Sequence, residues 1–264
     1  MKTINELMIE YMNKGLTTNQ AESSVCQQII ISKISKSKFA DNVLLKGGVV
    51  MFHLTNNTRR ATIDLDFDFI RYDISNPSIE AFINLLNRYD EQYKISAVEI
   101  KELKQDDYHG KRVFVDVKDK TRSIRFKLDI GVHTLLAIEQ KSLCFSFGDK
   151  ETLLKINPPE QIVSEKLYSL AKHNALSSRY KDVFDIYYLI NNCDLDKKII
   201  RKCLELLTIN GLHEIHSIED VCDKVNETLE DSDFLSHLNS TKDKWIDEET
   251  QIVTKTILDY IYSI

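Results

Sequence analysis

The sequence contains little proline and glycine and lacks a long apolar run. Its 264 residues include 3 prolines and 7 glycines, which argues against a turn-rich β-sandwich and against a disordered linker protein. No apolar stretch approaches the roughly 18–20 residues that cross a bilayer, and the polar residues near the N-terminus do not fit a secretory signal. We therefore expect a globular protein of the cytoplasm without a membrane partner.

Cysteine is also sparse, with five residues and no CxxC pair. Their wide spacing argues against a disulfide framework and against a zinc site, so we expect reduced thiols. Hydrophobic content of 42% and charged content of 29% are typical of a globular protein long enough to bury a substantial core. The cysteines are Cys26, Cys144, Cys193, Cys203 and Cys222.

Negative charge is concentrated in the last quarter of the chain. The net charge is −6, but residues 194–264 carry 16 acidic and 8 basic residues, which leaves +2 for residues 1–193. Two stretches are basic: 31–60 has six Lys/Arg against one acid, and 101–127 has nine against five. Such a face can attract phosphates, although an ordinary solvated surface explains the same counts.

Apolar spacing predicts an α+β domain over residues 1–155 and a helical domain over 156–264. In the first domain we expect helices over 18–39, 49–54 and 76–89, and strands over 43–45, 63–69, 94–100, 112–117, 123–132 and 143–147. After Pro158-Pro159 we expect helices over 160–173 and 178–192, followed by about four more, the last of which includes 252–264.

Three aspartates at alternate positions mark the expected strand 63–69. Alternation would bury Ile63, Leu65, Phe67 and Phe69 on one face and place Asp64, Asp66 and Asp68 on the other. Carboxylates this close repel one another unless water, a cation or a metal neutralises them. We expect Asp64 and Asp66 to be metal ligands, and Asp68 either to support them or to be merely exposed.

A Gly-Gly turn, Lys46-Gly47-Gly48, precedes the helix that leads into this strand. A helix that begins at such a turn offers free backbone N–H groups to a phosphate. Alone, a glycine pair is often only a tight turn, and an acidic strand face is often only solvated. Their combination favours a site that binds a phosphorylated ligand.

A third carboxylate, Asp129, lies on the polar face of the expected strand 123–132, together with Arg125 and Lys127. If this strand neighbours 63–69, Asp129 joins Asp64 and Asp66 around a hard cation, Mg²⁺ or alternatively Mn²⁺. Lys127 would either neutralise the carboxylates before a metal arrives or contact nucleotide phosphates.

The segments described so far resemble the AbiEii/AbiGii family of abortive-infection toxins, within the nucleotidyltransferase fold of the polymerase-β superfamily. In that family a KGG turn precedes the signature R-x-[ST]-x-D-[LI]-D-[FL], matched here by Arg60, Thr62, Asp64, Leu65, Asp66 and Phe67. The helical domain resembles the family's E-K-L-x-A-L and R-x-K-D-x-x-D segments, with Ser169 in place of the usual alanine. The matching residues there are Glu165, Lys166, Leu167, Arg179, Lys181, Asp182 and Asp185.

The resemblance implies a mixed sheet flanked by helices and a helical domain that completes the active site. It also implies transfer of a nucleoside monophosphate from an NTP to RNA, with tRNA as the expected acceptor, in phage defence and under a winged-helix antitoxin. The implied catalytic residues are Asp64, Asp66, Asp129, Lys166 and Asp182, of which the first three hold the metal. The implied nucleotide-binding residues are Lys46, Gly47, Gly48, Thr62, Lys127, Arg179, Lys181 and Asp185.

The charged residues of the helical domain allow a functional and a structural interpretation. The movable ammonium of Lys166 suits a triphosphate, and Asp182 could orient it. A solvated helix face with ion pairs one turn apart would contain the same residues.

Two other functions stay open. The same chemistry could modify a small molecule or a protein side chain, and the fold could be a catalytically inactive binding module. A glycosyltransferase fits less well, because only about 63 residues precede the acidic strand.

Overall fold

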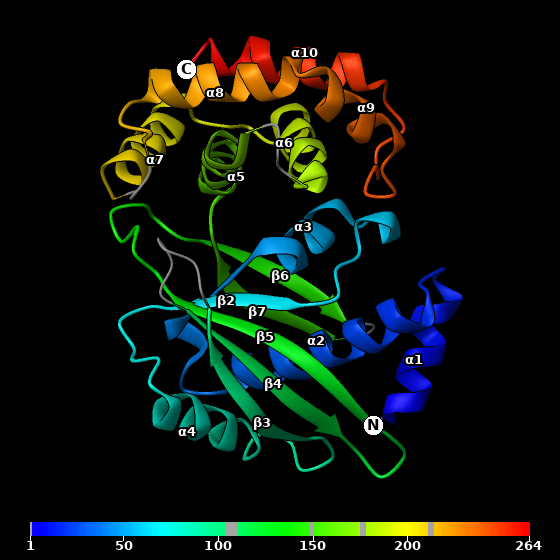
Figure 1. Cartoon of the computed structure of the whole chain (residues 1–264). Helices are drawn as coiled ribbons and strands as arrows, with labels where there is room; N and C mark the ends of the chain where they lie inside the picture. The colour runs from blue at the N-terminus through cyan, green and yellow to red at the C-terminus, as the bar shows by residue number, and fades with distance from the viewer. Residues whose placement is uncertain (1, 104–109, 148–149, 175–177, 211–213) are drawn as a thin grey trace. The chain divides into compact units, whose positions relative to one another are not determined.

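The helical and extended patterns of the sequence form two units in the computed structural model, which describes residues 2–103, 110–147, 150–174, 178–210 and 214–264 (Figure 1). Unit 1 comprises Met1–Thr134 and Gln140–Ile156, and unit 2 comprises Leu135–Glu139 and Asn157–Ile264. Unit 1 combines a sheet with helices, which confirms the α+β class. No helix in the described ranges is long and apolar enough to cross a membrane.

Unit 1 is built on a mixed sheet of seven strands in the order β3-β4-β5-β2-β1-β7-β6. Strand β2 runs parallel to β5 and β1 runs parallel to β7, whereas the other pairs are antiparallel. The strands are β1 Val43–Lys46, β2 Leu65–Phe69, β3 Lys94–Glu102, β4 Gly110–Lys118, β5 Ser123–Val132, β6 Lys141–Phe147 and β7 Lys150–Ile156.

The described residues of unit 1 include four α-helices, and two of them begin with capping boxes. Thr3 and Thr17 accept the backbone N–H three residues ahead, while Glu6 and Gln20 accept the N–H of the capping residues. The helices are α1 Ile4–Asn13, α2 Thr18–Lys36, α3 Gly47–Thr55 and α4 Asn76–Leu86, with short 3₁₀ segments at Ala40–Asn42 and Thr58–Arg60.

Strand β2 is held by aromatic packing on the face opposite its carboxylates. Phe67 and Phe69 are fully buried and lie against Phe82 of α4, with ring centroids 5.9 and 5.0 Å apart. Phe39 adds an edge contact to Phe82 at 5.3 Å. This packing fixes which way β2 faces, because a shift of one residue would exchange its two faces.

The prediction for residues 63–69 was wrong in two respects. The strand begins at Leu65, and the Ile63 side chain is 53% exposed rather than buried. Of the two alternatives considered for Asp68, an exposed position is excluded, because Asp68 is only 6% exposed. Its oxygen lies 2.6 Å from the Lys46 ammonium, because β1 and β2 are paired and Lys46 ends the neighbouring strand.

Unit 2 consists of helices in its described residues. The first of them begins at Pro159, one residue before the predicted start, and the second begins at Tyr180, two residues after it. Segment 135–139 belongs here too, because Leu135 and Ile138 pack against Cys203. The helices are α5 Pro159–His173, α6 Tyr180–Asn192, α7 Lys197–Asn210, α8 Ile218–Glu230, α9 Ser232–Ser240 and α10 Thr250–Ile261.

Candidate active site

The Gly-Gly turn is in direct contact with the acidic segment. Helix α3 begins at Gly47, immediately after β1, and Gly47 has a φ of +66°. A Cβ atom on Gly47 would lie 2.2 Å from Oδ2 of Asp66, and one on Gly48 would lie 2.5 Å from Oγ1 of Thr62. Only glycine allows this approach, which brings the free N–H groups of the first helical turn close to the carboxylates.

Two of the three predicted ligands occupy opposite positions on neighbouring strands. Strands β2 and β5 are paired in parallel, with Asp66 directly opposite Asp129. Asp64 lies just before the first residue of β2. The two strands are therefore neighbours, which was the condition for Asp129 to join Asp64 and Asp66.

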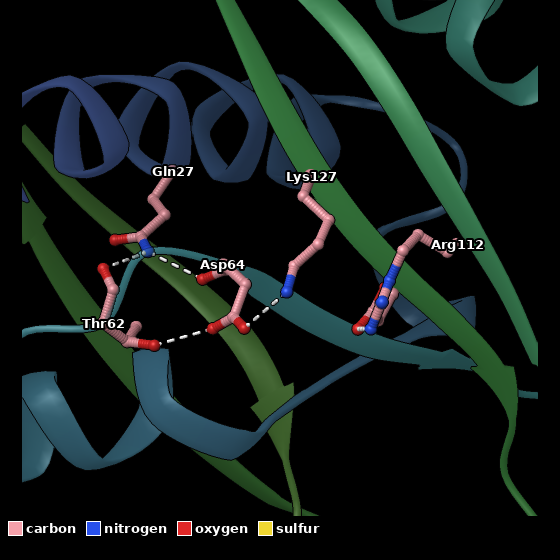
Figure 2. A network of polar contacts seen from close by, with 6 residues as sticks. Gln27, Thr62, Asp64, Arg112 and Lys127 are labelled. Atoms are coloured by element: carbon pink, nitrogen blue, oxygen red, sulfur yellow. Dashed lines mark hydrogen bonds and ion pairs between the residues drawn. The ribbon is translucent and has the colours of Figure 1, made fainter. Parts of the chain in front are cut away.

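The Asp64 carboxylate is held by a network that extends to α2 (Figure 2). Thr62 Oγ1 donates to Asp64 Oδ1 at 2.7 Å, and the Lys127 ammonium lies 3.1 Å from Oδ2. Gln27 of α2 donates to the backbone oxygens of Asp64 and Thr62, at 2.8 and 3.2 Å. Burial raises the pKa of Asp64, but the hydrogen bond from Thr62 and the charge of Lys127 outweigh burial, so its pKa is lowered.

Asp66 has a different environment. Burial, followed by the negative charge of Asp64, raises its pKa to about 7, although Lys46 acts in the opposite direction. No hydrogen bond or ion pair reaches its carboxylate from the described residues. A carboxylate in this position would be strongly stabilised by a bound cation.

Asp129 is bound by an arginine that sequence reasoning missed. Arg112 Nε donates to Oδ1 at 2.9 Å and Nη2 donates to Oδ2 at 2.8 Å. Arg112 is directly opposite Asp129 in the β4–β5 hairpin. The short connection between these strands, residues 119–122, could have revealed the pairing, since it fixes the hairpin register.

The carboxylate oxygens of Asp64, Asp66 and Asp129 are suitable ligands for a hard divalent cation, but the three side chains do not converge on one point. Carboxylate oxygens are the ligands that Mg²⁺ prefers, and the strand register brings Asp66 and Asp129 together. Within the described part of the chain, no three His, Cys, Asp or Glu side chains are arranged to hold a metal ion. Asp64 and Asp129 are instead turned toward Lys127 and Arg112, so joint binding of a cation requires these carboxylates to turn.

The predicted nucleotide-binding residues of unit 1 contact the carboxylates. Lys46 pairs with Asp68, Thr62 donates to Asp64, and Lys127 pairs with Asp64. Of the two roles considered for Lys127, neutralising the carboxylates is the one that this contact supports. Binding of phosphate by these residues stays a prediction.

The remaining predicted residues belong to unit 2, where Lys166 forms the centre of a half-buried cluster. Its ammonium pairs with Asp182 and lies 2.9 Å from Asp185 Oδ2. Arg179 Nη1 is 3.4 Å from the other oxygen of Asp182. Asp185 is fully buried and accepts a hydrogen bond of 3.1 Å from Trp245 Nε1. These contacts do not describe a merely solvated helix face.

Lys181 has a separate partner, Asp243, at 3.3 Å. Asp243 and Trp245 both precede α10, in the acidic last quarter of the chain. Trp245 is therefore a second residue that sequence reasoning missed. Its distance of 60 residues from Asp185 left no local signal, although it is the single tryptophan of the chain.

Solved structures with a similar fold include nucleotidyltransferase-like proteins. A candidate nucleotidyltransferase from H. pylori is 17% identical and covers 94% of this chain and 96% of its own, with a TM-score of 0.51. JHP933 from Helicobacter pylori is 14% identical over 94% and 95%, with a TM-score of 0.45. An antigenic nucleotidyltransferase-like protein from Paracoccidioides brasiliensis is 15% identical over 72% and 87%, with a TM-score of 0.41. The first likeness supports a shared fold and nothing more.

No curated protein matches the sequence. Residues 29–251 match the family described as "Nucleotidyl transferase AbiEii toxin, Type IV TA system". This range is most of the chain, and it includes the carboxylates of unit 1 as well as Lys166 and its partners in unit 2. The chain therefore belongs to the AbiEii family of nucleotidyltransferase toxins from type IV toxin–antitoxin systems.

Proposed function

We propose that this nucleotidyltransferase toxin depends on a divalent cation and transfers a nucleoside monophosphate from an NTP to RNA, with tRNA as the acceptor. The observation that carries the proposal is the contact between the Gly-Gly turn and Asp66, beside Asp129 on the paired strand. Phosphate-binding N–H groups and oxygen ligands for a cation are thus adjacent. Nucleotidyl transfer as proposed here requires both the phosphate-binding groups and the cation ligands.

The three aspartates Asp64, Asp66 and Asp129 would hold Mg²⁺, or Mn²⁺ in its place. The bound cation would supply charge for the phosphates and a lowered pKa for the attacking hydroxyl. The turn at Gly47 and Gly48 would bind the triphosphate through its N–H groups. Thr62, through Asp64, would keep one ligand oriented.

Lys166 is proposed to contact nucleotide phosphates, with Asp182 and Asp185 holding its ammonium in place. Because the pair with Asp182 is little exposed, the ammonium is oriented rather than freely rotating. Arg179 and Lys181 would contribute further positive charge to nucleotide binding. Each has a carboxylate partner, Asp182 and Asp243 respectively.

The family implies an antitoxin partner, which we propose to be a winged-helix protein, and we propose a role in phage defence in the cytoplasm. An RNA acceptor would contact basic residues of the stretch 101–127, of which 104–109 lie outside the described residues. Binding to phosphates releases counter-ions, so RNA affinity should fall as salt rises.

The test is nucleotide transfer to total RNA. Purified protein is incubated with Mg²⁺, RNA and each labelled NTP in turn, beside an Asp66→Asn variant. Label on a tRNA-sized band that is absent with the variant supports the proposal and identifies the donor. Nucleotide binding without labelled RNA would indicate a small-molecule or protein acceptor. Neither labelling nor Mg²⁺-dependent nucleotide binding would leave an inactive binding module.

A further inference from the structure

Cations of the protein itself already balance most of the acidic cluster. Four carboxylates lie on or directly before the paired strands β2 and β5, next to the Gly-Gly turn, and three of them have a basic partner. Asp68 pairs with Lys46, Asp64 with Lys127 and Asp129 with Arg112; Asp66 is the fourth. Lys127 and Arg112 approach from the neighbouring strands β5 and β4 (Figure 2). The basic side chains of the cluster thus balance all of its carboxylates except Asp66.

Arg112 has the most directional of these contacts. Its guanidinium binds both oxygens of Asp129, at 2.9 and 2.8 Å. A pair of parallel N–H···O bonds fixes the plane of the carboxylate as well as its position. Asp129 is directly opposite Asp66, yet in this orientation it does not join the other aspartates around a common point.

We propose that Arg112 is a positioning residue that binds Asp129 and competes with the divalent cation for this carboxylate. The inference rests on the proposed metal-dependent function and adds a residue to it. A guanidinium that stays on Asp129 repels an incoming cation and uses one lone pair of each oxygen. The cation must therefore displace Arg112 or turn Asp129 away from it.

The same hairpin contains a matched control. Arg125 pairs with Asp116, the residue directly opposite it on β4, with Nε 2.5 Å from Oδ1 and Nη2 3.4 Å from Oδ2. This pair joins the same two strands and lies on the same face as Arg112, four residues along β4 and away from the Gly-Gly turn. Asp116 is not one of the predicted metal ligands, so an ordinary cross-strand ion pair is represented by Arg125.

The test is Mn²⁺ binding measured by calorimetry, without nucleotide, for the wild type, Arg112→Gln and Arg125→Gln. We expect Arg112→Gln to bind Mn²⁺ between about three and ten times more tightly, because a competing charge is removed. Without metal, this variant should unfold at a lower temperature than the wild type, and Mn²⁺ should restore more of its stability. Arg125→Gln should leave Mn²⁺ affinity unchanged.

Two further variants keep the test decisive. Arg112→Lys retains the charge but not the two parallel bonds, so its Mn²⁺ affinity should lie between those of the wild type and Arg112→Gln. In an Asp129→Asn background, Arg112→Gln should no longer tighten binding, because the contested carboxylate is absent.

The other possible outcomes would contradict either the competition by Arg112 or the metal-dependent function. If the wild type binds Mn²⁺ and neither Arg112 variant binds it more tightly, Arg112 is not a competitor, while the proposed function stands. Weaker binding by Arg112→Gln would mean that the guanidinium orients Asp129 for the metal instead. If no form binds Mn²⁺, with or without an NTP, the inference and the metal-dependent function are both wrong.

Discussion

The two charged clusters of this toxin are built in opposite ways. Around the Gly-Gly turn, four carboxylates meet three basic side chains, and Asp66 has no partner among the described residues. In unit 2, Lys166 and Arg179 balance Asp182 and Asp185. Asp185 also accepts the indole N–H of Trp245. One cluster has excess negative charge, and the other has matched charges and satisfied hydrogen bonds.

This difference separates function from stability. A buried carboxylate without a counter-ion destabilises the fold, so its presence is better explained by a ligand than by packing. A matched buried cluster contributes to folding, and removal of one partner leaves a buried charge behind. Substitution of Asp66, which has no partner among the described residues, should therefore affect activity with little loss of stability, whereas substitution of a partnered charge in either cluster should also lower stability.

The largest effect is expected for Asp66→Asn, with a loss of transfer activity of about a thousandfold. Its free energy of unfolding should stay level or rise by about 1 kcal/mol, because an unpaired buried charge is removed. Labelled-transfer rates and urea unfolding at pH 7 measure both quantities.

Asp68→Asn on the same strand is the control for that variant. Asp68 pairs with Lys46, so its loss should lower stability by about 2 kcal/mol, since it weakens a buried ion pair. A larger loss of stability for Asp66→Asn than for Asp68→Asn would contradict the contrast drawn between partnered and unpartnered carboxylates.

In unit 2, Asp185→Asn should lower the free energy of unfolding by about 3 kcal/mol, because the Lys166 ammonium loses a fully buried partner. Chemical denaturation followed by circular dichroism measures the change. Trp245→Phe removes the hydrogen bond to Asp185 together with part of a buried ring, and should cost at least about 1 kcal/mol. Equal stability of Asp185→Asn and the wild type would show that this cluster does not stabilise the fold.

Gly47→Ala should lower the free energy of unfolding by about 2–3 kcal/mol, combining a strained positive φ with a clash. The added methyl would lie 2.2 Å from Asp66 Oδ2. Gly15 is the matched position, because it also has a positive φ, +93°, but its added Cβ meets no atom within 4 Å. Gly15→Ala should cost about 1 kcal/mol and keep full transfer activity. Thermal unfolding of both variants separates strain from clash.

Local patterns in the sequence predicted most elements but not their partners. The regular alternation of apolar and polar residues over 123–132 predicted strand β5 with the bounds that the structure shows. Strand β7 was missed because Leu153 and Leu154 are adjacent and apolar, yet only Leu154 is buried and Leu153 is 64% exposed. Helix α1 was also missed, since only a few of its residues face the core.

The same limit applies to the candidate site. The Gly-Gly turn and the aspartates could be predicted because each motif lies within a few consecutive residues. The pairing of Arg112 with Asp129 depends on strand register, and that of Trp245 with Asp185 depends on tertiary packing. Ile63 was misassigned because an apolar residue beside a strand need not be buried.

The smallest expected effect is a pH dependence of the free energy of unfolding, caused by His53 in unit 1. His53 lies against Phe145 and Phe147, at centroid distances of 4.8 and 5.2 Å, and burial lowers its pKa to about 4. The folded state then binds fewer protons than the unfolded state between pH 6.5 and 4, so stability is complete above this window and falls as pH decreases through it. Between pH 7 and pH 5 the loss should be about 2 kcal/mol. His53→Phe should remove this part of the acid sensitivity in urea unfolding. An unaltered pH profile for His53→Phe would mean that its ring is protonated without cost, and that the apolar packing around α3 is looser than these distances indicate.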